Sequence, residues 1–558
     1  MPNAAPEGTP HTRSRGRSNL PRYALALFAS VAAATGCAAV LGLDETTLRD
    51  GDGGVPEAGT TPADVEVPTE DAGEAGAADA PLSLSPASLL VRRNATAAFT
   101  VTLARTATTP ATVTATLTDL PPGVTASTLT LGPGQTSGTI TVTTGAFVAL
   151  GATTVRVTTT STPAIPGGTA SLLVGGDPGT PDTTFDTDGI AADASKGQAA
   201  TFYALAVQPD GKILAGGAAA GGGWLLRRFE ANGAADPTFA AATATLPNDG
   251  EIRAVAVDAQ NRIVCVGTSN VPNGGLPQIT VARLLPSGAR DASFSGNAVA
   301  RAATLEAPSG SSGLTLAVEA DGSVYAAGAR VEDGGQSGIV LKLRGSDGAR
   351  DPSWNAGKLR VVEQNRLVGV ASDGAGTVTL GGTDTSSNVA TYYLARLRAD
   401  GGLDPGFGTS GTSTFAVSYR AQAFTRLPSG ALVLVGDLQP TGGYTAGLAT
   451  PLGASIFSRA PAIANGASFN AVAPVGNAGF VAAGHASGPN GEARVMRILV
   501  DGGADTSFST GGAVILDPAG TANGFDLTLY ATALQPDGRV LVAGNRTGAG
   551  AVVYRLWQ

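Results

Sequence analysis

Apolar and polar residues alternate one by one along the stretch from residue 81 to residue 176. Runs at 98–103, 111–117, 138–143 and 154–159 carry apolar side chains at alternating positions, with Thr at most of the others. Alternation with a period of two is typical of strands that bury one face. Turns rich in Gly and Pro separate the runs, so we expect six or seven short strands packed as a β-sandwich.

A longer pattern recurs from residue 179 to residue 558. Its first half is an apolar strand, a turn such as Gln-Pro-Asp-Gly and a second apolar strand that ends in Gly, as at 204–217 and 531–544. Seven copies align on that Gly at spacings of 48 to 61 residues: Gly217, Gly267, Gly328, Gly382, Gly436, Gly484 and Gly544. A repeat of this length, rich in short strands and Gly, predicts a β-propeller. Seven copies predict seven blades.

The second half of each copy is a further strand followed by an Asp-x-x-aromatic element. It recurs at Asp182/Phe185, Asp236/Phe239, Asp291/Phe294, Asp351/Trp354, Asp404/Phe407 and Asp505/Phe508, whereas the fifth copy keeps only Phe457. We expect the Asp side chains to cap backbone N–H groups of the turn that follows. We expect the aromatic side chains to pack between neighbouring blades. Because these residues recur once per blade, they cannot converge on one site.

The copies at the two ends of the repeat region are incomplete in complementary ways. The seventh copy stops at 552–558, before its Asp-x-x-aromatic element, and that element stands at 182–185, ahead of the first full copy. Strands from both ends can therefore complete the last blade. Such closure pairs strand edges that would otherwise promote aggregation.

The amino terminus has the features of an export signal. Four Arg residues precede an apolar run at 23–35, which is too short to span a bilayer as a helix. The run leads into Gly36 and Cys37, and this stretch resembles the bacterial lipoprotein signal, in which the Cys is acylated. The resemblance implies lipidation at Cys37, and Ala38 after it implies the outer membrane. An ordinary signal peptide with an incidental Cys is the alternative. The acidic segment 37–80 is expected to be a disordered linker.

Two further resemblances concern the folded regions. The stretch 120–144, LPPGVTASTLTLGPGQTSGTITVTT, resembles bacterial Ig-like modules that occur on surface proteins. The repeat resembles the delta-60 repeat family, which is predicted to form β-propellers in secreted and surface bacterial proteins. That family has no established catalytic residues, so none transfers to this chain. We therefore expect an all-β protein with a signal peptide at 1–36, a linker at 37–80, an Ig-like β-sandwich at 81–176 and a seven-bladed propeller at 179–558.

Composition narrows the chemistry. Charged residues make up 14% of the chain and the net charge is −9, which disfavours nucleic-acid binding. Two Cys and two His are too few for a disulfide scaffold or a His-based zinc site. We therefore predict no metal and no cofactor. His485 lacks a Gly-x-Ser-x-Gly partner motif, and Cys265 stands in an apolar run, so neither indicates a catalytic residue.

The residues that begin the innermost strands bear on a hydrolase alternative, which would need paired carboxylates near the propeller axis. In the seven copies, the position that leads into the innermost strand is occupied by Tyr203, Arg253, Leu314, Val368, Gln422, Asn470 and Tyr530. None of these residues is acidic.

The leading hypothesis is a monomeric, non-catalytic outer-membrane lipoprotein, on the periplasmic or the cell-surface face, whose propeller binds a protein or a glycan. Candidate ligand contacts are Arg253, Arg366, Arg420 and Asn470. The alternatives are a structural envelope component without a specific ligand and a carboxylate-dependent hydrolase.

Overall fold

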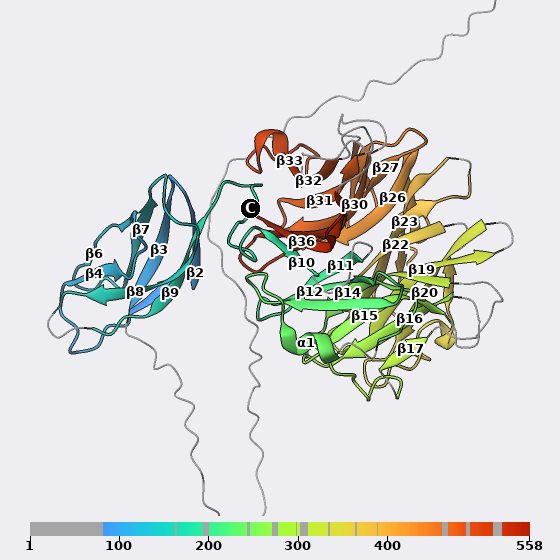
Figure 1. The fold of residues 1–558 in the computed structure, drawn as a ribbon, viewed down its shortest axis with the longest axis horizontal. Coiled ribbons are helices and arrows are strands. Elements are labelled where there is room, and N and C mark those ends of the chain that lie inside the picture. The colour runs from blue at the N-terminus through green and yellow to red at the C-terminus, as the bar shows by residue number, and fades with distance from the viewer. Residues whose placement is uncertain are drawn as a thin grey trace, which may run out of the picture. The chain divides into compact units, whose positions relative to one another are not determined.

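The computed structural model describes residues 82–161, 165–193, 200–242, 246–270, 277–296, 298–301, 311–332, 335–362, 365–387, 389–459, 467–486, 492–516 and 527–558. Strands dominate these residues, which contain one short α-helix, α1 (Pro237–Ala242) (Figure 1), and the all-β expectation is confirmed. No helix in the described ranges is long and apolar enough to cross a membrane. The signal peptide, Cys37 and the acidic linker lie outside the described residues.

The amino-terminal module consists of two sheets that share one core. One sheet has the order β1-β3-β7-β5 and the other β2-β9-β8-β4-β6, with β2 and β9 parallel. Alternate residues of β3 and β7, such as Phe99 and Ile140, are buried against Val155 and Leu172 of the second sheet. The strands are β1 (Leu82–Ser85), β2 (Ser88–Arg92), β3 (Thr96–Leu103), β4 (Val113–Thr118), β5 (Val124–Ala126), β6 (Leu129–Leu131), β7 (Ser137–Thr144), β8 (Gly151–Thr159) and β9 (Thr169–Gly175).

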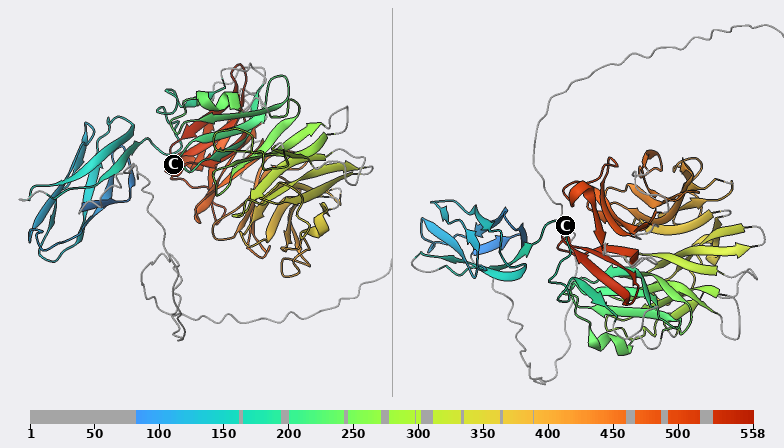
Figure 2. Two further views of the ribbon diagram at one scale, coloured as in Figure 1. Left: turned by 90° about the horizontal axis from the view of Figure 1, so that it is seen from below. Right: turned by 45° about the horizontal axis from the view of Figure 1, so that its top comes forward.

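The repeat region forms seven antiparallel sheets within the described residues. Their first strands are β11 (Thr201–Val207), β14 (Glu251–Val257), β18 (Ser311–Val318), β22 (Asn365–Ser372), β26 (Tyr419–Arg426), β30 (Ala467–Val475) and β34 (Leu527–Leu534). Each first strand contacts the first strand of the next sheet, and β34 contacts β11. The sheets therefore close into a ring, with the first strands nearest its axis (Figures 1 and 2).

The remaining strands extend each sheet outward from the axis. The second strands are β12 (Ile213–Ala218), β15 (Ile263–Asn270), β19 (Val324–Glu332), β23 (Val378–Asp384), β27 (Leu432–Leu438), β31 (Gly479–Ala486) and β35 (Val540–Arg546). The third strands are β13 (Trp224–Phe229), β16 (Pro277–Leu284), β20 (Gly335–Leu343), β24 (Thr391–Leu397), β28 (Tyr444–Ala449), β32 (Glu492–Leu499) and β36 (Gly550–Leu556). The outermost strands are β10 (Ile190–Ala192), β17 (Val299–Arg301), β21 (Arg360–Val362), β25 (Thr412–Val417), β29 (Ser455–Arg459) and β33 (Ala513–Leu516).

Strand β10 supplies the outermost strand of the last sheet, although it precedes the first. Ile190 pairs with Tyr554 and Ala192 with Val552 in an antiparallel register. Nearby, the backbone N–H of Asp182 donates to the carbonyl of Arg555 at 2.8 Å. The split of the last repeat predicts this pairing, because residues 182–192 supply the part of the repeat that is missing after β36.

The recurring Gly of each repeat faces a β-bulge in the first strand. In the first sheet Phe202 pairs with Gly217 and Ala204 with Gly216, so Tyr203 is the extra residue. A Cβ on Gly217 would lie 1.8 Å from the carbonyl oxygen of Thr201, and the other six Gly residues show corresponding distances of 1.8 to 2.3 Å. No side chain fits there, which explains why Gly recurs. The bulge turns its extra residue out of the regular alternation.

A second recurring unit joins neighbouring sheets, and we call it the Arg–Asp clasp. In each clasp the Asp of the Asp-x-x-aromatic element accepts the backbone N–H two residues on at 2.9 to 3.0 Å, so the capping expectation is confirmed. The other carboxylate oxygen of the Asp forms an ion pair with an Arg or Lys side chain on the third strand. The clasps are Asp182–Arg555, Asp236–Arg228, Asp291–Arg283, Asp351–Lys342, Asp404–Arg396 and Asp505–Arg497, at 2.6 to 3.4 Å.

The clasp reaches into the next sheet through its Arg and its aromatic side chain. Arg283 lies 4.5 Å over the Phe294 ring and donates to the carbonyl of Gly345 in the following sheet. Phe294 packs against Gly348 of that sheet, where a Cβ would lie 2.8 Å from the ring. Phe407 packs in the same way against Gly453. The expectation that these aromatic residues pack between neighbouring blades is confirmed.

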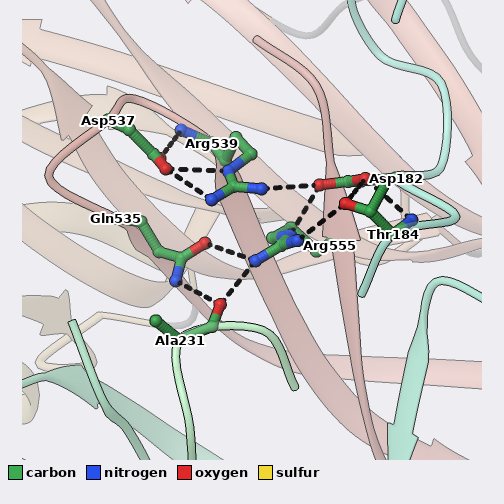
Figure 3. Close-up of polar contacts among 7 residues, drawn as sticks. All are labelled: Asp182, Thr184, Ala231, Gln535, Asp537, Arg539 and Arg555. Atoms are coloured by element: carbon green, nitrogen blue, oxygen red, sulfur yellow. Dashed lines mark hydrogen bonds and ion pairs between the residues drawn. The ribbon is translucent and has the colours of Figure 1, made fainter. Parts of the chain in front are cut away.

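One clasp closes the ring (Figure 3). Asp182 is fully buried and receives Arg555 at 2.7 Å and Arg539 at 2.9 Å. Arg555 also donates to the carbonyl of Ala231 in the first sheet at 2.6 Å. Burial lowers the pKa of Arg555 to about 10, so this guanidinium stays charged at neutral pH. The two ends of the repeat region are therefore held by the same unit that joins the other sheets.

We expect the clasps to make stability dependent on pH in acid. Burial alone would raise the pKa of Asp236 and Asp291, but hydrogen bonds from the following hydroxyl and from the Arg outweigh it and lower the pKa. The hydroxyl of Ser507 lowers the pKa of Asp505. A carboxylate with a lowered folded-state pKa stabilises the fold above its unfolded pKa, near 4, and loses that contribution as the pH falls. Urea midpoints should be flat from pH 7 to 5 and fall below about pH 4, by at least about 1 kcal/mol. Asp236→Asn should weaken this dependence, and an unchanged midpoint down to pH 2 would contradict it.

Candidate functional site: the axial cavity

A cavity of about 400 Å³ lies on the axis of the ring, and all seven sheets contribute to its wall. The extra residues of the seven bulges all line it: Tyr203, Arg253, Leu314, Val368, Gln422, Asn470 and Tyr530. The close approach at the recurring Gly produces the bulge, and the bulge turns its extra side chain toward the axis. The repeated backbone therefore creates a site whose seven equivalent wall positions carry six different residue types.

The cavity is polar at one level and mostly apolar at the next. Five of the seven bulge residues carry a polar group, whereas the wall residues two positions further along the first strands are Leu205, Val255, Phe424, Val472 and Thr532. A few polar groups beside an apolar surface are typical of pockets that bind small molecules. The volume of this cavity lies at the lower end of the range for such pockets.

Two tyrosines and an arginine form one side of the polar level. The Tyr203 and Tyr530 rings meet edge to face with centroids 5.1 Å apart, and the Arg253 guanidinium lies 4.0 Å over the Tyr203 ring. Glu251 holds Arg253 through an ion pair of 2.5 Å. Burial raises the pKa of Tyr530, so its hydroxyl stays protonated at neutral pH. This side offers aromatic rings and a guanidinium already fixed in position.

The opposite side is built around Arg366 and two amides. Arg366 donates from Nη1 to the carbonyl of Ala421 at 3.0 Å and to Oε1 of Gln422 at 3.3 Å. Burial, followed by repulsion from Arg420, lowers the pKa of Arg366. Asn470 donates to the carbonyl of Leu529 at 2.9 Å and lies 3.0 Å from Nδ1 of His485, whose pKa is lowered by burial.

Asp437 forms a buried hub beside the cavity. Its carboxylate pairs with Arg420 at 3.1 Å and accepts hydrogen bonds from Gln422 at 3.0 Å and from the amide of Gln439. Arg420 is the cross-strand partner of Asp437 and does not line the cavity. The structure thus brings Arg253, Arg366 and Asn470 together around one cavity and places Arg420 outside its wall.

Sequence reasoning missed Tyr203, Gln422 and Tyr530 as site residues. The signal that could have found them was present, because they occupy the same repeat position as Arg253 and Asn470. Within the described residues, no group of three His, Cys, Asp or Glu side chains is arranged to hold a metal ion. Cys265 is buried, and burial raises the pKa of its thiol.

The family comparison bears on the scaffold that surrounds this cavity. A family model described as a domain of unknown function (DUF5122) beta-propeller matches residues 208–239, 261–294 and 376–407. These three segments match β-propeller repeats of this family. The resemblance of the repeat to a propeller family is therefore confirmed. No curated protein sequence gives a significant match.

The matched segments of the DUF5122 propeller end at Phe239, Phe294 and Phe407, the aromatic residues of three Asp-x-x-aromatic elements. They begin after the first strand of their sheet, so they leave out the bulge and every residue that lines the cavity. Each matched segment thus covers the second and third strands of its sheet and the Asp-x-x-aromatic element, and so includes the clasp.

Proposed function

We propose that the protein is an exported, non-catalytic, monomeric lipoprotein, anchored in the outer membrane through Cys37, whose propeller binds a protein or a glycan at its axial cavity. The observation that carries this proposal is the wall of the cavity, to which the seven sheets contribute six different residue types from one repeated position. Residues that only maintained the ring would repeat, as the clasp residues and the recurring Gly do.

The proposal includes a seven-bladed propeller preceded by an Ig-like spacer. Seven sheets in a ring closed by β10 and β36 support the blade count. Two sheets around one core, with short strands and tight turns, support the Ig-like assignment.

Binding without catalysis is supported by the state of the acidic groups near the cavity. Glu251 pairs with Arg253, and Asp437 is held by Arg420, Gln422 and Gln439. A general acid or base must be free to exchange a proton with the substrate. Carboxylates that are committed to cations and amides are poorly suited to that role.

Array binding by the full-length protein tests the site. We expect a subset of glycans or peptides to bind, and Asn470→Ala or Tyr530→Ala to reduce that signal at least about tenfold, because each removes wall contacts. Arg398→Ala is the matched control, since Arg398 is exposed in an outer turn and should leave binding unchanged. Thermal unfolding verifies that each variant folds. A signal that survives both wall variants would place binding elsewhere and contradict the proposal.

The anchor makes a separate prediction. In bacteria that express the full-length chain, the wild type and Cys265→Ala should incorporate labelled palmitate. Cys37→Ala should lose the label, because the acyl chains would attach at Cys37, and it should lose its stable membrane anchor as well. Cys265 is the natural control, since it is the other Cys of the chain and is buried. Globomycin should block processing of the wild type. Equal labelling of Cys37→Ala would rule out this anchor.

A further inference from the structure

Charge balance around the axial cavity singles out Arg366. Arg253 is matched by Glu251 at 2.5 Å, and Arg420 is matched by Asp437 at 3.1 Å. Among the described carboxylates, none forms an ion pair with Arg366, which donates only to a backbone carbonyl and to an amide oxygen. The cavity therefore has one positive charge without a partner in the described part of the chain.

The hydrogen-bonding capacity of Arg366 is only partly used. Both of its hydrogen bonds within the described residues leave from Nη1, so Nε and Nη2 keep donors for a ligand. A guanidinium offers paired donors in a planar fork that matches a carboxylate. A single carboxylate would neutralise the one unmatched charge. A dianion such as a phosphate monoester would leave a negative charge uncompensated in a half-buried site.

The rest of the wall suits a sugar ring. Tyr203 and Tyr530 offer aromatic surface. The amide oxygens of Gln422 and Asn470 border the same space and have lone pairs that can accept hydrogen bonds from sugar hydroxyls. Phe424 and Val472, two positions beyond the bulge residues of their strands, add apolar surface to the wall. A cavity of about 400 Å³ admits a small unit of a chain and not a folded domain.

We propose that the axial cavity binds a uronic-acid unit of an acidic glycan, with the sugar carboxylate on Arg366 and the sugar face against Tyr203 and Tyr530. This inference rests on the proposed function, because it assumes that the cavity is the binding site. It adds the class of ligand and names the residue that selects the charge.

Titration of matched sugars into the full-length protein tests the ligand class. Methyl glucuronide and methyl galacturonide carry the carboxylate, methyl glucoside carries none, and glucose 6-phosphate carries a dianion. We expect at least one uronide to bind about tenfold or more tightly than the glucoside, because the glucoside lacks the charge-assisted contact with Arg366. We expect it also to bind more tightly than the phosphate, because the dianion leaves one negative charge uncompensated. Arg366→Gln should reduce uronide binding to the glucoside level, Arg366→Lys should restore part of it, and Arg398→Gln should leave it unchanged.

The outcomes separate the two proposals. Equal binding of uronides and glucoside, or tighter binding of the phosphate, overturns the uronic-acid assignment and leaves the cavity as a binding site. Absence of binding for both uronides likewise overturns the assignment. Array binding that is insensitive to Asn470→Ala and Tyr530→Ala overturns the cavity itself. If Arg366→Gln fails to fold, the comparison of uronide with glucoside on the wild type still decides the charge preference.

Discussion

Replacing Asp182 with Asn is expected to lower the free energy of unfolding by about 4 kcal/mol. Asp182 is fully buried and is the shared partner of Arg555 and Arg539, whose side chains are 2% and 12% exposed. The amide keeps the shape of the carboxylate and its cap on Thr184, but it removes the negative charge. Arg539 keeps its ion pair with Asp537 at 2.5 Å, but the buried Arg555 loses its only carboxylate in the described residues and faces a second guanidinium. Removing one partner of a buried ion pair in this way is the costly way to break it. Denaturant unfolding of the full-length protein measures the loss.

Asp291→Asn is the matched control for this variant. Its clasp with Arg283 is also buried, but these two residues are only eight positions apart in the chain, whereas Asp182 and Arg555 are 373 positions apart. We expect both variants to lose stability, and only Asp182→Asn to release β10 from β36. Limited proteolysis under native conditions should therefore cut Asp182→Asn between residues 177 and 192 and leave Asp291→Asn intact there. Identical cleavage of the two variants, or a loss below about 1 kcal/mol for Asp182→Asn, would show that this clasp does not hold the ends together.

Gly217→Ala is expected to cost about 3 kcal/mol and to disturb the cavity at the same time. The added Cβ would lie 1.8 Å from the carbonyl oxygen of Thr201 and 2.9 Å from the Cα of Phe202, and both are backbone atoms of β11 that cannot rotate away. The first strand must shift, and with it the bulge that carries Tyr203 toward the axis. We therefore expect lower stability together with weaker ligand binding.

Gly221→Ala is the control for this effect. Gly221 follows the same strand by a few residues, has no heavy atom within 4 Å of the position of a new Cβ, and adopts no left-handed backbone conformation. It should unfold at the same denaturant concentration as the wild type and bind equally well. A wild-type midpoint for Gly217→Ala would mean that the bulge tolerates a side chain, and the explanation for the recurring Gly would then fail.

The ring could be predicted from the sequence because each of its parts requires a local sequence pattern. The recurring Gly indicates the close approach of two strands, and the Asp-Gly turn indicates a hairpin. The Asp-x-x-aromatic element at Asp182, which stands ahead of the first full copy, indicates the pairing of the ends. Each pattern comes from a steric or hydrogen-bonding need of the backbone, which does not change from copy to copy. The alternation of apolar residues in β3 and β7 predicts the buried face of the amino-terminal module for the same reason.

The clasp and the cavity were harder to predict. An Arg stands eight residues before Asp236, Asp291 and Asp404, so a regular spacing was present, but a spacing does not say that the two side chains meet. Arg420 shows that a predicted site residue can lie outside the cavity. It occupies the first strand as Arg366 does, yet its cross-strand neighbour is Asp437, which draws it into an ion pair outside the cavity wall. Such choices depend on partners in other strands, which no single repeat reveals.

The closing clasp also fixes the order of events when the protein is made. Asp182 and Arg555 are 373 positions apart, so a ribosome produces β10 long before its partner β36 exists. Six sheets are synthesised between them. Throughout that interval β10 has an open backbone edge, and a neighbouring nascent chain can pair with it. The ring becomes complete only when β36 emerges, and a chain terminated before β36 would lack the strand that β10 needs.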